Sequence, residues 1–112
     1  MRAGLLRNRV VIEMLPPVDE RPRDEYGAPL EVWAEYAVRW GAVEPLQGRE
    51  FFEAQQMQAA ADHRIRFRYD ELTAAITPSM RLRHGAKLYD VQSVQNPDAR
   101  HQELHVIVRE RA

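Results

Sequence analysis

The stretch HRIRFRY at residues 63–69 alternates basic and apolar side chains without interruption. A β-strand points successive side chains to opposite faces, so Ile65, Phe67 and Tyr69 share one face while the intervening arginines share the other. A helix would require apolar residues three and four positions apart, and here they are strictly two apart. The stretch therefore predicts a strand with its apolar face in the core, and it indicates a mainly β fold.

The segments around this stretch indicate further strands. Residues 9–15 (RVVIEML) are almost continuously apolar, which predicts a strand covered on both sides. Residues 30–46 contain a strand that Pro45 ends. Later in the chain, MRLRHG, KLYDVQSV and ELHVIVRER alternate in the same way, separated by a turn at Gly85 and by the turn NPDAR. Strands this closely spaced favour a small antiparallel β-barrel or sandwich.

Two segments interrupt the strand pattern. Residues 48–62 (GREFFEAQQMQAAAD) lack β-branched residues and place apolar side chains at helical spacing, which predicts one α-helix packed against the sheet. Residues 16–29 (PPVDERPRDEYGAP) hold four prolines and six charged residues, which predicts a long, exposed, Pro-rich loop. The length of 112 residues fits a single domain, 1–112.

Trp33 and Trp40 lie close together in the segment before Pro45. Tryptophans in such a segment are expected to anchor the core. The alternative is an exposed aromatic contact, since Trp is also enriched at interfaces.

Composition excludes several classes of protein. The chain has 16 Lys and Arg against 17 Asp and Glu, so its net charge of −1 gives no overall attraction to nucleic acid or to an anionic membrane. Cysteine is absent, which excludes disulfides and thiolate metal sites. No apolar run approaches the roughly 20 residues that span a bilayer, and the N-terminus lacks a long apolar signal core. We therefore expect no membrane contact and no export.

No motif favours catalysis. Ser79 and Ser93 stand in no nucleophile motif, and no Gly-rich phosphate loop is present. The four histidines show no helical metal-ligand spacing; they are His63, His84, His101 and His105. We therefore predict no enzyme, no metal site and no cofactor.

Arginines on the outer strand faces are the remaining candidate site. They are Arg64, Arg66 and Arg68 on one strand, and Arg81 and Arg83 on the strand expected beside it. Such a stripe could follow a phosphate backbone, which leaves open a non-specific nucleic-acid-binding barrel. However, Phe67 and Tyr69 lie on the opposite face and cannot stack with bases there. We therefore favour contacts between these arginines and acidic groups of a neighbouring subunit or partner protein.

Six motifs follow each other along essentially the whole chain: AGLLRNRVVIE, DEYG, RWGAVEPLQGREFFEA, HRIRFRY, ITPSMRL and LYDVQSVQNPD. In this order they resemble the siphophage head closure family, whose members are also called head-to-tail joining, stopper or connector proteins. Gly41 departs from the alanine that is common after the preceding tryptophan.

The resemblance implies a structural virion protein of the head-to-tail connector. Such proteins assemble as a ring under the portal and adaptor after DNA packaging, retain the genome, and offer a platform for tail docking. The implied partners are portal, adaptor and tail proteins and further copies of the chain, which can be monomeric in isolation. Packaged DNA would pass through the ring without sequence-specific contact. The implied location is the neck of the virion, after synthesis in the bacterial cytoplasm. Other neck components, an adaptor or a tail terminator, remain alternatives.

The Pro-rich loop is the leading candidate for a channel-facing or adaptor-docking element, because the core holds it least and it can change conformation at low cost. Its candidate residues are Asp19, Glu20, Arg21, Arg23, Asp24, Glu25 and Tyr26. The rival candidate is the junction at residues 47–62, around the predicted helix.

Overall fold

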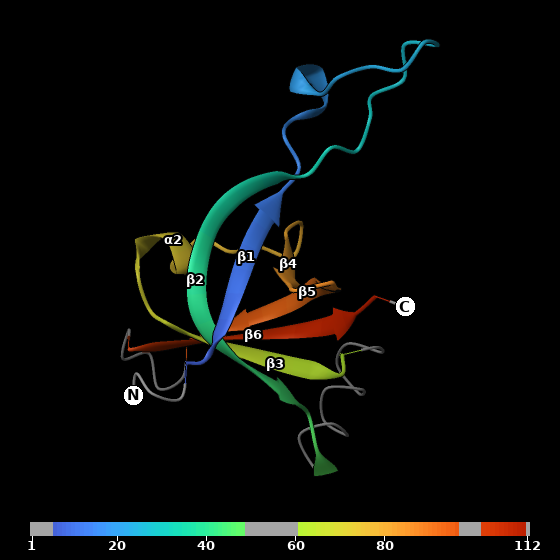
Figure 1. Ribbon diagram of the computed structural model, residues 1–112. Helices are drawn as coiled ribbons and strands as arrows, with labels where there is room; N and C mark the ends of the chain where they lie inside the picture. Colours follow the sequence, from blue (N-terminus) through green and yellow to red (C-terminus); the bar gives the residue numbers. More distant parts are fainter. Residues whose placement is uncertain (1–5, 49–60, 97–101, 112) are drawn as a thin grey trace.

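Six antiparallel strands form a closed barrel in the computed structural model, which describes residues 6–48, 61–96 and 102–111 (Figure 1). The strands are β1 (Asn8–Met14), β2 (Ala34–Pro45), β3 (His63–Arg68), β4 (Arg81–His84), β5 (Lys87–Gln95) and β6 (Glu103–Glu110). Their order around the barrel is β1-β2-β3-β6-β5-β4, and pairing of β1 with β4 closes it. The predicted antiparallel barrel is confirmed, and closure excludes the open sandwich.

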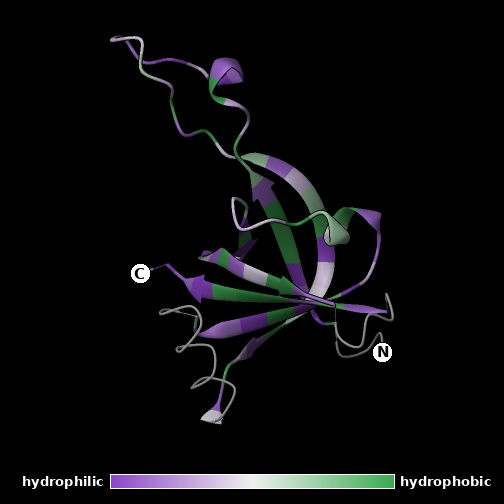
Figure 2. Ribbon diagram, turned by 180° about the vertical axis from the view of Figure 1, so that it is seen from behind, coloured by the Kyte–Doolittle hydropathy of each residue, from purple (hydrophilic) through white to green (hydrophobic). Residues whose placement is uncertain are grey.

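The alternating side chains of the strands fill the barrel interior. Ile65 and Phe67 of β3 are completely buried, as HRIRFRY predicts, and they pack in one cluster with Val106 and Val108 of β6. Tyr69 lies partly buried against the same cluster. Burying one such side chain contributes about 1.5–3 kcal/mol. Figure 2 shows the resulting change between hydrophobic and hydrophilic residues along the strands.

A second, smaller cluster combines Leu46, Ala61 and Ile107. Ile107 alternates with Val106 and Val108 along β6, so this strand is buried on both faces here. The helix predicted at 48–62 lies almost entirely outside the described residues, and so does the predicted turn NPDAR except for Asn96.

A short helix, α2 (Glu71–Ala74), follows β3 and is absent from the sequence-based prediction. Asp70 caps it, because its carboxylate accepts the Thr73 backbone N–H at 2.8 Å while the Thr73 hydroxyl accepts the Asp70 N–H at 2.9 Å. This reciprocal pair is a capping box. Four residues are too few to show an apolar period, so only the cap marks the helix in the sequence.

The connection between β1 and β2 extends far from the barrel (Figure 1). We call residues 16–32 the arm; it contains the predicted loop 16–29 and a 3-10 turn, η2 (Val18–Glu20). Only Pro16 and Arg21 in the arm are partly buried, and its other residues are exposed. The prediction of a long exposed loop is confirmed. The β4–β5 connection turns at Gly85, also as predicted.

Candidate interaction surfaces

The tip of the arm is a preformed turn built on the DEYG motif. One carboxylate oxygen of Asp24 accepts the backbone N–H groups of Tyr26 at 2.8 Å and Ala28 at 2.9 Å. Gly27 has φ +83°, a left-handed backbone conformation that residues other than glycine rarely adopt. The Asp24 carboxylate and the backbone freedom of Gly27 therefore specify the turn locally, without support from the barrel.

The arm presents apolar and acidic side chains to solvent. Val18, Tyr26, Leu30 and Val32 are its exposed large hydrophobic residues, and Tyr26 is 87% exposed. Arg21 donates to the Pro16 carbonyl and Arg23 to the Gly27 carbonyl, so both predicted arginines are engaged within the arm. No ion pair joins Asp19, Glu20 or Glu25 to another described residue. The predicted arm residues are thus together on one projecting element, on which carboxylates outnumber arginines five to two.

Trp33 fixes the base of the arm against the barrel. The Arg81 guanidinium lies 4.4 Å from the centroid of its ring and the Arg111 guanidinium 5.9 Å. The Arg81 Nε donates a hydrogen bond to the Glu13 carboxylate at 2.8 Å, and the Arg111 Nε donates one to the Asp90 carboxylate at 2.9 Å. These two ion pairs orient the cations over the indole, and such cation–π contacts contribute about 0.5–2 kcal/mol each.

Arg81 and Arg83 do not continue the arginine stripe of β3. The sequence places them on the strand beside β3, but β4 pairs with β1 and β5, whereas β3 pairs with β2 and β6. Both side chains point to Glu13 on β1, with Nε–O distances of 2.8 and 3.5 Å. The expectation of one continuous stripe is wrong, because the order of strands is not their order along the chain.

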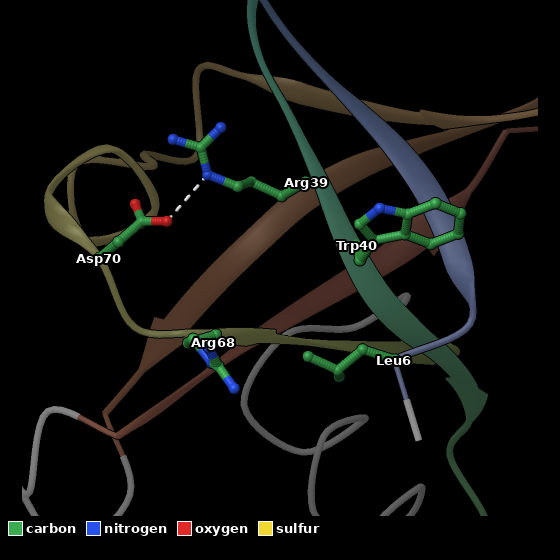
Figure 3. A pocket seen from close by; sticks show the side chains of 5 residues that line it. All are labelled: Leu6, Arg39, Trp40, Arg68 and Asp70. Atoms are coloured by element: carbon green, nitrogen blue, oxygen red, sulfur yellow. Dashed lines mark hydrogen bonds and ion pairs between the residues drawn. The ribbon is translucent and has the colours of Figure 1, made fainter. Parts of the chain in front are cut away.

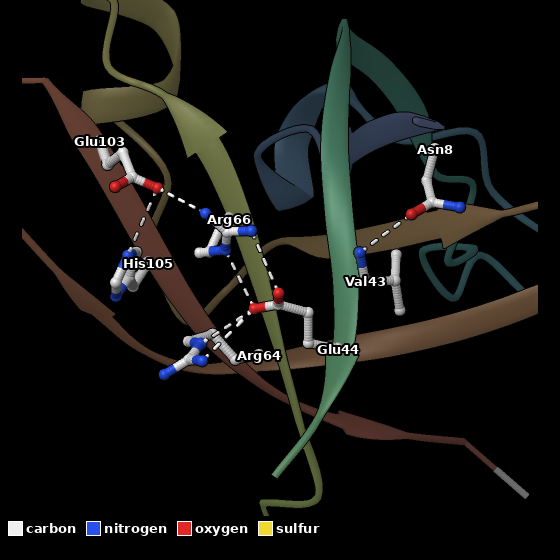
Figure 4. Close-up of polar contacts among 7 residues, drawn as sticks. All are labelled: Asn8, Val43, Glu44, Arg64, Arg66, Glu103 and His105. Atoms are coloured by element: carbon white, nitrogen blue, oxygen red, sulfur yellow. Dashed lines mark hydrogen bonds and ion pairs between the residues drawn. The ribbon is translucent and has the colours of Figure 1, made fainter. Parts of the chain in front are cut away.

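Arg64 and Arg66 lie in an ion-pair network on the outer face of the barrel (Figure 4). Arg66 makes two hydrogen bonds to Glu44, at 3.0 and 3.1 Å, and one to Glu103, at 2.9 Å. Arg64 shares Glu44 at 3.3 Å. Burial raises the pKa of Glu44, but the hydrogen bonds and charges of Arg66 and Arg64 outweigh this and hold that pKa below its ordinary value. The network neutralises much of the charge that the sequence assigns to this face.

His105 borders the network without joining it by a hydrogen bond. Its Nε2 is buried, has no hydrogen-bond partner, and lies 3.8 Å from a Glu103 carboxylate oxygen. Burial and the positive charge of Arg64 lower the pKa of His105, with Arg66 acting in the same direction. The imidazole is therefore neutral at pH 7.

Trp40 corrects the expectation of a core anchor, because it is 60% exposed. It lines a groove of about 530 Å³ on the outside of β2 and β3 (Figure 3). The lining residues are Leu6, Arg39, Trp40, Arg68 and Asp70. Arg39 donates to Asp70 at 2.8 Å, while Arg68 is exposed and has no acidic partner in the described part of the chain. Arg68 is thus the arginine of β3 whose charge is available, and it lies beside an exposed indole.

No group of three or more His, Cys, Asp or Glu could hold a metal ion within 6–48, 61–96 and 102–111. His101 lies outside these residues. None of the helices described is long and apolar enough to cross a membrane.

Comparison with known proteins identifies relatives along the full length of the chain. The family model for the phage head completion protein matches residues 1–111. A solved structure, protein SF1141 from Shigella flexneri 2a, is 27% identical with a TM-score of 0.69, covering 100% of this chain and 98% of that one. A chain from the virion of a native gene transfer agent particle shares the fold at 20% identity and a TM-score of 0.59, covering 95% of this chain and 96% of that one. A search of curated proteins gives no match. Because the family match spans nearly every residue, the chain belongs to the phage head completion protein family.

Proposed function

We propose that the chain assembles as a ring at the joint between head and tail, where it retains packaged DNA and provides a platform for the tail. Membership of the family makes it a structural virion protein and not an enzyme. Ring assembly, genome retention and tail docking are the roles that we propose for it within the virion.

The arm is the observation that carries this proposal. Each strand of the closed barrel pairs with a neighbour on both sides over part of its length, which leaves only short stretches of unpaired strand edge, such as residues 34–40 of β2 on the side of β3. We therefore expect association to use mainly side-chain surfaces and loops. The arm extends far from the barrel (Figures 1 and 2). It supplies a preformed turn, exposed apolar side chains and carboxylates without an ion-pair partner among the described residues. We propose that it contacts another protein of the particle.

The related fold in the gene transfer agent was solved within a virion, which supports a place in a particle for this fold. In a ring, each subunit must use two different surfaces, because each contact is heterologous and closes by rotation. The arm is one candidate surface, and the face that carries Arg68 is another.

The arginines contribute to this role unequally. Arg64 and Arg66 already bind Glu44 and Glu103 of their own chain, so they chiefly stabilise the barrel. Arg81 and Arg83 bind Glu13, and Arg81 also supports the base of the arm. We propose that Arg68 is the member of the predicted set that meets a partner.

The same pairing argues against the alternative of a nucleic-acid-binding barrel. A phosphate backbone approaching Arg64 and Arg66 would compete with Glu44 and Glu103, and Phe67 is buried where it cannot stack with bases. We expect at most weak binding to single-stranded DNA at physiological salt. Strong binding that falls steeply with salt would favour the alternative.

Membership of a head completion family favours the proposed role at the joint between head and tail over the role of an adaptor or a tail terminator.

Deletion of the gene in the producing phage or prophage tests the proposal. We expect heads that package DNA and then lose it, together with intact unattached tails, when lysates are examined by electron microscopy. The wild-type chain supplied in trans should restore joined particles. Normal infectious particles from the deletion would overturn the proposed function.

A further inference from the structure

We infer that the arm of one copy of the chain docks into the groove beside Trp40 on the barrel of the next copy. This inference rests on the proposed ring and names the contact that would build it.

The exposed apolar side chains of the described residues fall into two groups. Four belong to the arm: Val18, Tyr26, Leu30 and Val32. Of the other two, Trp40 lies on β2 and lines the groove, and Leu72 lies on α2. A large exposed indole beside a groove is typical of an interaction site. The groove is open to solvent in a single copy, and the arm has apolar side chains to place in it.

The charges of the two surfaces are opposite. Within the groove, Arg39 neutralises Asp70, which leaves the Arg68 guanidinium uncompensated. Arg9 is exposed and lies directly across from Trp40 in the β1–β2 register, which adds a second cation at the edge of the groove. The arm has the opposite net sign, because it carries five carboxylates against two arginines, a formal charge of −3 over residues 16–32. Opposite charges around an apolar centre favour one partner and one orientation.

The direction of the arm indicates that the groove it fills belongs to another copy. The arm leaves the barrel at the Ala34 end of β2 and runs away from it (Figure 1). Trp40 lies roughly 20 Å along β2 in the opposite direction, given a rise of about 3.3 Å per residue. The stacking of Trp33 on Arg81 fixes the base of the arm in this direction. An arm held in this direction points away from its own groove and can reach the same groove on a neighbour, which is a head-to-tail contact.

Photo-cross-linking in assembled particles tests this contact. Tyr26 is 87% exposed, so a photoreactive aromatic amino acid, p-benzoylphenylalanine, can replace it without disturbing the barrel. The variant is supplied in trans to the gene deletion, and purified particles are irradiated. We expect a product of twice the chain mass, with the link mapped by mass spectrometry to the peptides that contain Trp40 or Arg68. The same photoreactive residue at exposed Ser79 should give no link to these peptides.

Charge variants then test the chemistry of the groove. Arg68→Glu should lower the yield of the product at least tenfold per incorporated chain, whereas Arg68→Lys should retain most of it. Arg109→Glu is the matched control, because Arg109 is an exposed arginine of β6 for which no ion pair is present among the described residues. It should leave the yield unchanged.

The outcomes separate this inference from the proposed function. Tyr26 adducts with DNA, with another virion protein or with a different face of the barrel would overturn the inference while leaving a functional ring protein. A yield unaffected by Arg68→Glu would overturn it too. Absence of the chain from joined particles would overturn the proposed function, and the inference with it.

Discussion

Replacing Gly41 with alanine should destabilise this barrel, because a side chain at this position would have no room. Gly41 lies on β2 and pairs with Asn8 on β1 and with Phe67 on β3. A Cβ at this position would lie 2.9 Å from the Arg66 carbonyl oxygen and 3.0 Å from a carbon of the Phe67 ring. Neither neighbour can move freely, because the carbonyl belongs to β3 and the ring is completely buried.

Two effects of the substitution oppose each other. Alanine restricts the unfolded chain, which would stabilise the protein by about 0.4–1 kcal/mol if the native site accepted it. Overpacking a filled core costs about 1–3 kcal/mol, and the contact with a strand backbone places Gly41→Ala at the upper part of this range. We therefore expect a net loss of about 2 kcal/mol, which lowers the melting temperature of a domain of this size by about 10 °C.

Thermal and urea unfolding of the purified variants measure this effect. A double-mutant cycle with Phe67→Leu separates the ring from the carbonyl, because leucine removes the aromatic carbons nearest to the new Cβ. Gly41→Ala should cost less in the Phe67→Leu background than in the wild type. A wild-type melting temperature for Gly41→Ala would refute the packing argument, and strictly additive effects would refute the role of the ring.

Three further predictions concern charged and aromatic side chains. Arg66→Glu should lower the free energy of unfolding by about 2 kcal/mol, because the carboxylates of Glu44 and Glu103, both half-buried, would then face a third carboxylate. Arg109 is exposed, so Arg109→Glu should change the free energy of unfolding by less than about 0.5 kcal/mol. Equal effects of the two substitutions in urea unfolding would contradict the network. Trp33→Ala should cost about 1 kcal/mol through loss of the Arg81 stacking, with Trp33→Phe retaining part of it, and an unchanged melting temperature for Trp33→Ala would argue against this contact. The pKa of His105 is lower in the folded state than in the unfolded chain, so as the pH falls the unfolded chain takes up the proton at a higher pH. The free energy of unfolding therefore decreases as the pH falls from about 6.5 through the folded-state pKa. His105→Gln should flatten the dependence of unfolding free energy on pH in that window, and an identical slope would oppose the assignment.

Side-chain alternation made the strands predictable from the sequence. In HRIRFRY the period is strictly two, and the structure buries Ile65 and Phe67 completely. The arm was equally predictable, because its prolines and charges cannot form a core. α2 was not, because four residues show no period and only the Asp70 cap marks it.

The candidate site was less predictable, because it depends on which strands are neighbours. The charges of Arg64 and Arg66 suggest a basic face, but Glu44 lies opposite Arg64 only in the β2–β3 register. The sequence does contain both signs of charge, yet their spacing along the chain does not show that they meet. The expectation that Trp40 anchors the core was wrong for the same reason. Alternation shows that Trp40 and Gly41 lie on opposite faces of β2, but only the closed barrel shows that Trp40 is on the outer face.

The arm and groove also bear on when a ring can form. Each copy carries one arm and one groove, so two free copies make a single contact, whereas a closed ring makes one contact for every copy. Association of two proteins costs several kcal/mol in lost translational and rotational freedom, and one arm carrying four exposed apolar side chains offers little surplus over this cost. A surface on the filled head that holds the copies side by side removes most of that cost, because it raises their effective concentration. We therefore expect the purified chain to sediment as a monomer at micromolar concentration and to associate only on heads. A stable ring of the isolated chain in analytical ultracentrifugation would show instead that the contact between copies is strong enough to act without the head.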